Sequence, residues 1–528
     1  MMPLDKNVYK ALEGIVGPEH ISDDPAILDS YAWTTRVQNM EIRDGEVRLN
    51  KFARRFEAVL LPADTLEVQA IVKLCNRKQI KIRTFSTGFI AGNVPSGERV
   101  ILLDLRRMNR IIEIDEQNML AVVEPYVIGA QLQAELMKRG LIANVTGAGS
   151  HTSALPLAAF WGTGHMGQTV SNGERNLLAV EWVTPEGETV RIGSLGAIGE
   201  YFCGDGPGFS LRGVLRGAIT PMGGMGIYTK AATKVYHWPG PTEFPIEGTS
   251  PNYAPSAIPE NFMIRYFSFS TKERLQEAIC KIGEAEIAFE LMGFPVSMMA
   301  ANIATGNEEE VRLLADLRKA VKGPGFVVII VGNSRREFEY KKKVLERIVD
   351  ETEGRSLEMI EDERVGGALL WRLIRITASI RETFRATGEH TGIFPGHSEL
   401  GPIYRLTSRI ADLKQDLIAK GLLLDDGAEP FPWTEEHGSM AHAEVLIRYR
   451  SSPQTLQGIQ WLNEESIRLC LEEPAGVPFF VRGDRLHGIF GPSASNYHVW
   501  LRRLKKAFDP NGVCDPLDYI SPEEGQNS

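Results

Sequence analysis

The sequence predicts an α+β protein of two units, and three observations support this. The chain has 528 residues, more than one compact core usually holds. From about residue 55, segments with helical periodicity alternate with short β-rich runs, as in "TLEVQAIVKLCNRKQ" followed by "IKIRTF". A proline-rich crossing at residues 237–261 then separates this half from a second series of alternating helices and strands.

Composition and charge exclude several classes of protein. Hydrophobic residues make up 43% and charged residues 24% of the chain, which is typical of a globular protein. The formal net charge is -10 and there is no basic block, so we expect no nucleic-acid partner, because phosphate contacts need clustered Lys and Arg. No apolar run reaches about eighteen residues, so we expect no membrane span. The mixed-charge N-terminus "MMPLDKNVYKALEGIVG" leads us to expect a cytoplasmic location.

The cysteines are spaced too widely for a metal or disulfide framework. The five are Cys75, Cys203, Cys280, Cys470 and Cys514. None forms a C-x-x-C pair, which structural zinc and iron–sulfur sites usually require. We therefore expect free thiols and no metal site.

The N-terminal unit reads as helix, strand, loop, strand, hairpin and helix. The helix near residues 65–79 would bury one face, consisting of Leu66, Val68, Ile71, Val72 and Cys75. The strand-like runs "IKIRTF" and "RVILLDL" flank a glycine loop, and two strands in "IIEIDEQNMLAVVEPYV" are joined by a polar turn at residues 115–118. An amphipathic helix in "IGAQLQAELMKRG" would end at Gly140. The order β-α-β predicts a mixed sheet.

Three glycine-rich stretches mark the first half of the chain. They are "STGFIAGN", "NVTGAGSHTSALPLAAFWGTGHMGQTVSNGE" and "GDGPGFSLRGVLRGAITPMGGMGIYT". The first lacks the spacing of known phosphate-binding motifs. Such stretches are either sets of turns or places where the backbone closely approaches an extended ligand, and their number favours the ligand. Before the third stretch, Pro185, Glu186 and Gly187 indicate a hairpin turn.

An ordered set of segments resembles a known family. It runs through "FEAVLLPADTLEVQAIVKLCNRKQIKIRTFSTG", "VILLDLRRMNRIIEIDEQNMLAVVEPYV", "NLLAVEWVTPEGE", "MGIYTK" and "RLKKAFDPNGVCDP". This set is similar to the vanillyl-alcohol oxidase/p-cresol methylhydroxylase (PCMH) family of FAD-dependent oxidoreductases. The resemblance implies a PCMH-type FAD-binding domain in two parts, residues 1–240 and 486–528. It also implies an inserted α/β cap, or substrate, domain at residues 241–485.

The resemblance further implies an FAD site. Backbone N–H groups of the first stretch would bind the pyrophosphate without lysine. The second stretch would pass along the isoalloxazine and ribityl chain, and the strand in "GIYT" would meet the adenine part. The expected cofactor-binding residues are Ser86, Thr87, Gly88, Phe89, Ile90, Gly92, Asn93, Pro125, Ser153, Pro156, Gly162, Thr163, Gly164, Gly167, Ser171, Gly226, Ile227 and Thr229.

Candidate catalytic residues lie in the second half. Hydride transfer from a substrate hydroxyl carbon needs a base for the hydroxyl proton, and an anionic substrate needs a cation. His437, His442 and Glu444 lie in "EEHGSMAHAEVLIRYR", where the last two would share a face if the segment is extended. Arg482 stands among apolar neighbours, near where relatives carry a substrate-side arginine. Further candidates are Arg485, His487, His390 and His397. Each histidine is equally compatible with a surface or hydrogen-bonded structural role.

Departures from the family narrow what we expect of the flavin attachment, the substrate and a metal site. The first loop has no His or Cys, and the tyrosine that holds FAD in some relatives has no clear counterpart in "ETFRATGEHTGIF", so we expect noncovalent FAD. The tyrosine that binds a phenolate after the first loop in phenol oxidisers is absent from "GNVPSGE", which disfavours a phenolic substrate. The sequence "GDG" at residues 204–206 lacks the histidine of the metal motif found in lactate and glycolate dehydrogenases. It also lies in a different domain from that motif.

The leading expectation is therefore a dehydrogenase or oxidase that transfers hydride from a small organic substrate to FAD. One alternative is a 2-hydroxy-acid dehydrogenase subunit that passes electrons to a partner redox protein. Another is a non-catalytic FAD-binding subunit of a redox complex. We also expect a homo-oligomer.

Overall fold

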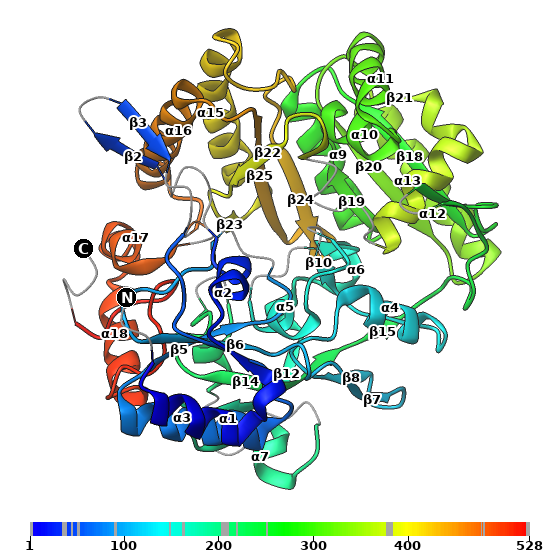
Figure 1. The fold of residues 1–528 in the computed structure, drawn as a ribbon. Coiled ribbons are helices and arrows are strands. Elements are labelled where there is room, and N and C mark those ends of the chain that lie inside the picture. Colours follow the sequence, from blue (N-terminus) through cyan, green and yellow to red (C-terminus); the bar gives the residue numbers. More distant parts are fainter. Residues whose placement is uncertain are drawn as a thin grey trace.

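The structure, a computed structural model, consists of two units around three main sheets. The described residues are 4–33, 40–43, 46–49, 53–88, 92–146, 149–160, 164–201, 211–217, 220–249, 252–375, 384–476, 478 and 481–523. In the view of Figure 1 the N-terminal half and the C-terminal tail form the lower unit, and a second unit with one large sheet lies above it.

The first sheet follows a β-α-β order near the N-terminus. Its strands, in spatial order, are β1 (Ile21–Ser22), β4 (Val59–Leu60), β6 (Val100–Asp104) and β5 (Lys81–Phe85). Both β4 and β5 run parallel to β6. The associated helices are α1 (Lys6–Val16), η1 (Pro18–His20), α2 (Pro25–Tyr31) and α3 (Thr65–Lys78). A separate hairpin of β2 (Met40–Arg43) and β3 (Glu46–Leu49) extends beside the upper unit (Figure 1).

Helix α3 connects β4 to β5, as the sequence predicted. The Asp64 carboxylate caps its N-terminus by accepting the N–H groups of Leu66 and Glu67, each at 2.9 Å. Val68, Ile71, Val72 and Cys75 are buried, but Leu66 is 73% exposed, so its predicted burial is wrong. At 3.6 residues per turn, Leu66 lies on the side opposite Val68 and does not share its face.

The second sheet is antiparallel and separate from the first. Its strands, in spatial order, are β13 (Thr189–Ile192), β12 (Leu177–Val183), β14 (Ile227–Lys234), β8 (Leu120–Val123) and β7 (Ile111–Asp115). The predicted hairpin is confirmed, since Val183 pairs with Thr189 around the turn. The sequence placed β7 and β8 in one mixed sheet with β5 and β6. Instead, β7 pairs with β8, and β8 pairs with β14, which lies far along the chain. Local sequence patterns carry no information on such a distant partner.

Short elements complete the lower unit before the cap. The paired short strands are β9 (Leu141–Ile142) with β15 (Tyr236–His237), and β10 (Val145–Thr146) with β11 (Gly164–His165). The helices are α4 (Gly129–Met137), α5 (Ala154–Ala159), α6 (Gly167–Val170), η2 (Gly173–Arg175), α7 (Ser194–Ile198) and α8 (Arg212–Leu215). After α4 the chain turns at Gly140, which has φ +70°.

The upper unit is built on a large antiparallel sheet. Its strands, in spatial order, are β21 (Arg355–Ser356), β18 (Phe262–Ser268), β20 (Gly325–Val331), β19 (Ala288–Gly293), β24 (Phe431–Glu435), β25 (Met440–Tyr449) and β22 (Glu389–Ile393), with β23 (His397–Ser398) also on β25. The helices are α9 (Lys272–Glu284), α10 (Val296–Ile303), α11 (Asn307–Ala320), α12 (Arg335–Glu351), η3 (Glu358–Glu361), α13 (Glu363–Arg375), α15 (Leu400–Ala419), η4 (Glu436–Gly438) and α16 (Pro453–Glu472). A hairpin of β16 (Ile246–Thr249) and β17 (Asn252–Pro255) precedes it.

Both faces of this sheet carry buried clusters. Met292, Trp433 and Leu446 belong to one cluster, and Leu291, Ala443 and Val445 belong to the other. Coverage on both faces explains why strands such as "GFVVIIV" are apolar throughout. The pairings of the described strands in this upper sheet are antiparallel. The predicted alternation of helices and strands is therefore realised here without a parallel sheet.

The C-terminal tail returns to the lower unit. After α17 (Gly483–Phe490) and α18 (Tyr497–Phe508), the chain runs beside β5, where Ile82 N–H donates to Val513 O at 2.7 Å and Asp515 N–H donates to Ile82 O at 2.9 Å. The buried Lys505 ammonium binds Asp509 at 2.5 Å and also the Gly224 and Cys514 carbonyls. This packing agrees with a two-part lower domain, while the boundaries at residues 240 and 485 stay predictions.

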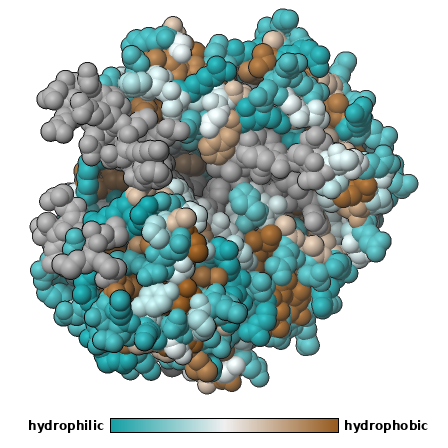
Figure 2. Space-filling view, viewed as in Figure 1, coloured by the Kyte–Doolittle hydropathy of each residue, from teal (hydrophilic) through white to brown (hydrophobic). Residues whose placement is uncertain are grey.

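The surface in Figure 2 is mainly hydrophilic, with hydrophobic residues in small separate groups. Within the described ranges, no helix is both long enough and apolar enough to cross a membrane.

Candidate active site

The first glycine stretch follows β5 and meets the second stretch. The Ser153 N–H donates to the Thr87 hydroxyl at 3.2 Å, and the Ser153 hydroxyl donates to the Pro125 carbonyl. Gly88 has φ +77°, and a Cβ there would lie 2.7 Å from the Phe85 ring, so glycine is required. Residues predicted to contact FAD in both stretches thus lie side by side. Ser86 and Gly92 lie in the described parts of the loop, while Phe89 and Ile90 fall outside the described residues.

Asn93, at the end of the first stretch, is held by protein contacts. Its side chain accepts from Arg83 Nε at 2.8 Å and donates to Tyr31 O at 2.7 Å, and its backbone pairs with Trp33. A structural role therefore accounts for Asn93 without a ligand.

The second stretch ends in the short helix α6, which contacts the cap. Pro156 lies in α5 and Gly164 in β11, whereas Gly162 and Thr163 fall outside the described residues. A Cβ at Gly167 would lie 3.1 Å from Glu435 Cγ of β24. The Ser171 hydroxyl donates to the Glu436 carboxylate, which also binds Arg175 at 2.5 Å.

Backbone strain gathers at this contact. Met166 and Ser171 flank α6 with φ of 68° and 58°, and Glu436 and His437 of η4 have φ of 47° and 57°. Non-glycine residues avoid this region because the Cβ crowds the backbone. Such strain is typical of functional sites.

The register of the cap strands defines one face above α6. His442 pairs with both Trp433 and His397, and Trp433 pairs with Met292. Because side chains alternate along a strand, Glu290 and Glu435 lie on the same face one step away, and Glu444 lies on it one step in the other direction. The prediction that His442 and Glu444 share a face is confirmed. We call this surface, made of Glu290, Met292, Phe394, His397, Trp433, Glu435, His442 and Glu444, the cap face.

Burial controls the charge state of the cap face. It raises the pKa of Glu444 to about 8, and lowers the pKa of His442, whose ring stacks on Phe394 with centroids 5.7 Å apart. Burial also raises the pKa of Glu290 to about 8, against the N–H groups of Met166 and Leu291 that its carboxylate accepts. Perturbed carboxyls and a neutral histidine in one buried place indicate a catalytic site.

Glu290 and Glu435 were not among the predicted site residues. Glu435 is fully buried, and its Oε2 lies 3.1 Å from His397 Nε2. The sequence signal that could have identified these two residues is a carboxylate inside an apolar strand, as in "AFELMG" and "FPWTE". Buried Glu is rare enough in a strand to deserve a functional interpretation.

Arg482 lies at the junction of the tail and the lower unit. Its Nη1 is 3.9 Å from Asp518 Oδ1, and Asp518 also binds Arg83 beside the first glycine stretch. Burial lowers the pKa of Arg482, Asp518 opposes this shift, and Arg83 adds to it.

The other predicted residues have structural settings. His437 lies in the β24–β25 turn, where its carbonyl packs against Gly283 of α9. Arg485 is exposed, 3.8 Å from Glu464, and the buried His487 contacts the Tyr497 hydroxyl at 3.1 Å. His390 pairs with Arg448 at the far end of β25, and burial lowers its pKa to about 3.

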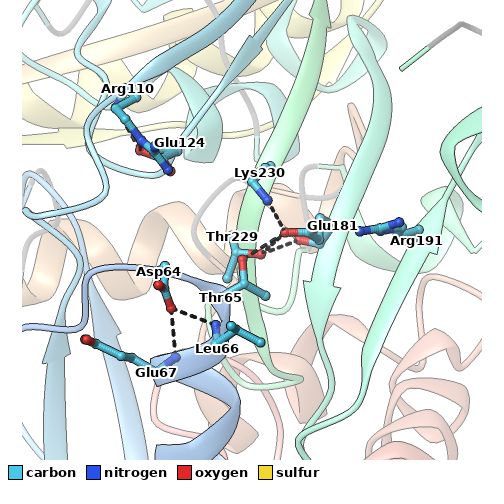
Figure 3. Close-up of polar contacts among 10 residues, drawn as sticks. All are labelled: Asp64, Thr65, Leu66, Glu67, Arg110, Glu124, Glu181, Arg191, Thr229 and Lys230. Atoms are coloured by element: carbon cyan, nitrogen blue, oxygen red, sulfur yellow. Dashed lines mark hydrogen bonds and ion pairs between the residues drawn. The ribbon is translucent and has the colours of Figure 1, made fainter. Parts of the chain in front are cut away.

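The third glycine stretch packs against the protein itself. A Cβ at Gly226 would overlap the Trp182 ring and the Val183 carbonyl. Ile227 is buried, and the Thr229 hydroxyl donates to Glu181 at 3.1 Å. Figure 3 shows Glu181 surrounded by Thr65, Thr229, Lys230 and Arg191, with the α3 cap at Asp64 nearby and the Arg110–Glu124 pair apart from them.

The described residues fit an FAD group. Asn144 Oδ1 and Gln168 Oε1 are buried acceptors that have no partner among the described residues. These acceptors lie along or against the second stretch, and they match the hydroxyl and N–H donors of the ribityl chain and flavin ring. Within the described ranges, no cluster of three metal-ligating side chains occurs.

Together, the first two glycine stretches and the cap face frame one candidate site where the lower and upper units meet. Residues 56–193 match the family described as FAD binding domain, which agrees with the FAD site that the sequence resemblance implied.

Solved structures share this fold, and a curated relative matches part of the chain. The 4-ethylphenol oxidase of Gulosibacter chungangensis has a TM-score of 0.73 at 20% identity, over 98% of this chain and 97% of that chain. A p-cresol methylhydroxylase structure has a TM-score of 0.73 at 16% identity, over 98% of both chains. The glycolate oxidase subunit GlcD of Bacillus subtilis is 30% identical over 142 residues, which span 26% of this chain and 27% of that protein.

Proposed function

We propose that this protein is an FAD-dependent oxidoreductase, a dehydrogenase or oxidase that acts on a small organic substrate. The observation that carries the proposal is the meeting of the second glycine stretch with the cap face at α6. Bound FAD supplies a two-electron acceptor, which protein side chains alone do not provide. The cap face supplies buried proton-binding groups, and the strained α6 holds it against the FAD-binding domain.

The experiment is to purify the protein and record its absorbance spectrum. The proposal expects a bound flavin whose spectrum bleaches anaerobically with one member of a panel of alcohols, amines and hydroxy acids. A protein with no flavin after reconstitution contradicts the proposal. A flavoprotein that no panel member bleaches favours the non-catalytic subunit.

We further propose that the FAD is noncovalent. Support comes from the first stretch, which offers no His or Cys, and from Phe384 in the segment where some relatives carry a linking tyrosine. Acid precipitation should leave the flavin in the supernatant, and flavin in the pellet contradicts this proposal. A cytoplasmic location and a homo-oligomer remain parts of the same proposal, which fractionation and light scattering test.

A second candidate is a 2-hydroxy-acid dehydrogenase subunit with a redox partner. The likeness to a glycolate oxidase subunit favours it. Bleaching by lactate or glycolate, with slow reoxidation by oxygen and fast reoxidation by a soluble electron acceptor, would support this alternative.

A further inference from the structure

We propose that Glu435, oriented by His397, is the proton acceptor of this site, and that the site takes an uncharged or cationic substrate bearing an O–H or N–H. This inference rests on the proposed function and deepens it. It concerns two residues on neighbouring parts of the cap face, on β24 and β23.

The Glu435 carboxylate has one satisfied and one unsatisfied oxygen. Its Oε2 faces His397 Nε2 at 3.1 Å, whereas its Oε1 is buried and has no hydrogen-bond partner in the described part of the chain. A buried carboxylate oxygen without a donor is costly, so native proteins seldom keep one unless a ligand completes it. Glu435 also lies against Gly167 of the second glycine stretch, which the sequence resemblance places along the flavin ring.

Asn172 determines which ring nitrogen of His397 carries the proton. The Asn172 Nδ2 lies 3.5 Å from His397 Nδ1, and an amide N–H can only donate. His397 Nδ1 is then the acceptor, and Nε2 carries the proton that it donates to Glu435 Oε2. This arrangement gives Oε2 its donor and leaves Oε1 to accept from a second donor. His397 is therefore a positioning residue, and Glu435 is the group that touches the substrate.

The proton balance of the step is complete. For an alcohol, the O–H bond breaks and the proton goes to Glu435 Oε1, while the C–H bond breaks and its hydride reduces the FAD named above. The products are the carbonyl compound, the protonated carboxyl and the reduced anionic flavin. A neutral amine gives an imine in the same way.

Neighbouring charges make this end of the site unsuitable for a substrate carboxylate. Glu436 follows Glu435 and pairs with Arg175, and Glu290, whose pKa is raised to about 8, lies on the adjacent strand of the same row. A substrate carboxylate would add a further negative charge beside Glu435 and Glu436 in this buried place, where it would be strongly repelled. The cation on β25, Arg448, is paired with Glu310 at 2.6 Å and lies six residues from His442, about 20 Å along an extended strand. It is too far away to neutralise a carboxylate next to the reacting carbon.

The test compares ligand binding and bleaching in flavinated protein. Benzyl alcohol and benzoate share one ring and differ in charge, and both are read from the shift of the flavin spectrum. The wild type should bind benzyl alcohol about tenfold or more tightly than benzoate, and Glu435→Gln should lose this discrimination. Glu435→Asp should retain it, and Glu429→Gln, which changes a carboxyl of the cap unit away from the cap face, should match the wild type.

Bleaching by the substrate found in the panel provides the second measurement. Glu435→Gln should bleach about a hundredfold more slowly and lose the acidic limb of the pH profile, with unchanged flavin content. His397→Gln should slow bleaching at saturating substrate while substrate affinity stays near the wild-type value. Wild type that binds benzoate as tightly as benzyl alcohol, or Glu435→Gln that bleaches at the wild-type rate, overturns the inference. Absence of flavin in the wild type instead overturns the proposed function.

Discussion

The second and third glycine stretches look alike in sequence but differ in the structure. At Gly226 and Gly224 the space that a Cβ would need is taken by Trp182 and Tyr519, so the third stretch has glycine for internal packing. The second stretch is flanked by strained residues and unsatisfied acceptors and faces the cap. Glycine density alone therefore marks close packing of any kind, and polar groups left without partners distinguish a ligand site.

The first prediction concerns the first stretch and has the largest expected effect. Gly88→Trp should abolish flavin binding, because φ +77° disfavours any side chain and the indole would occupy the approach to the loop. The measurement is the ratio of flavin to protein absorbance after purification with added FAD. Gly97→Trp is the matched control, because a Cβ there meets no described atom within 4 Å. A fully flavinated Gly88→Trp protein would remove this loop from the FAD site.

The second prediction tests the third stretch as a packing element. Gly226→Ala should cost about 4 kcal/mol of unfolding free energy, because the methyl group overlaps Trp182 and Val183 and φ is +109°. Thermal or denaturant unfolding measures this loss. Gly213→Ala, where a Cβ would meet no described atom within 4 Å, should be close to neutral. Equal stability of the two variants would mean that the third stretch has room for a ligand after all.

Parts of both units could be predicted from sequence because their signals are local. The α3 face, the hairpin at Pro185 and the strand that holds His442 and Glu444 all follow from short-range periodicity. The pairing of β8 with β14 is long-range and left no such signal. The same reason hid Glu290 and Glu435, which become neighbours of His397 only when three distant strands align.

The third prediction concerns Glu290, the buried carboxyl beside α6, and the pH dependence of stability. The pKa of Glu290 is raised from 4.5 to about 8, so the folded state holds its proton more tightly than the unfolded state does. Its contribution to stability is therefore complete below pH 4.5 and is lost as pH rises through about 8, by at most about 1.4 kcal/mol per pH unit. Glu290→Gln should remove this loss, so that the variant gains on the wild type above that window. Melting temperatures below and above the window measure it, and parallel pH curves for the two proteins would contradict the prediction.

The last prediction separates the substrate side of the site from its cofactor side. Arg482→Ala should keep flavin but reduce turnover about tenfold, or about 1.4 kcal/mol in the activation barrier. Arg482 shares Asp518 with Arg83, which holds the first glycine stretch through Asn93, so the structure also allows a cofactor role for it. Flavin content and steady-state kinetics, measured on the same preparations, decide between the two. Arg485→Ala, an exposed neighbour, is the control and should change neither. Lost flavin with normal turnover per bound flavin would move Arg482 from the substrate to the FAD, and the junction of tail and loop would then belong wholly to cofactor binding.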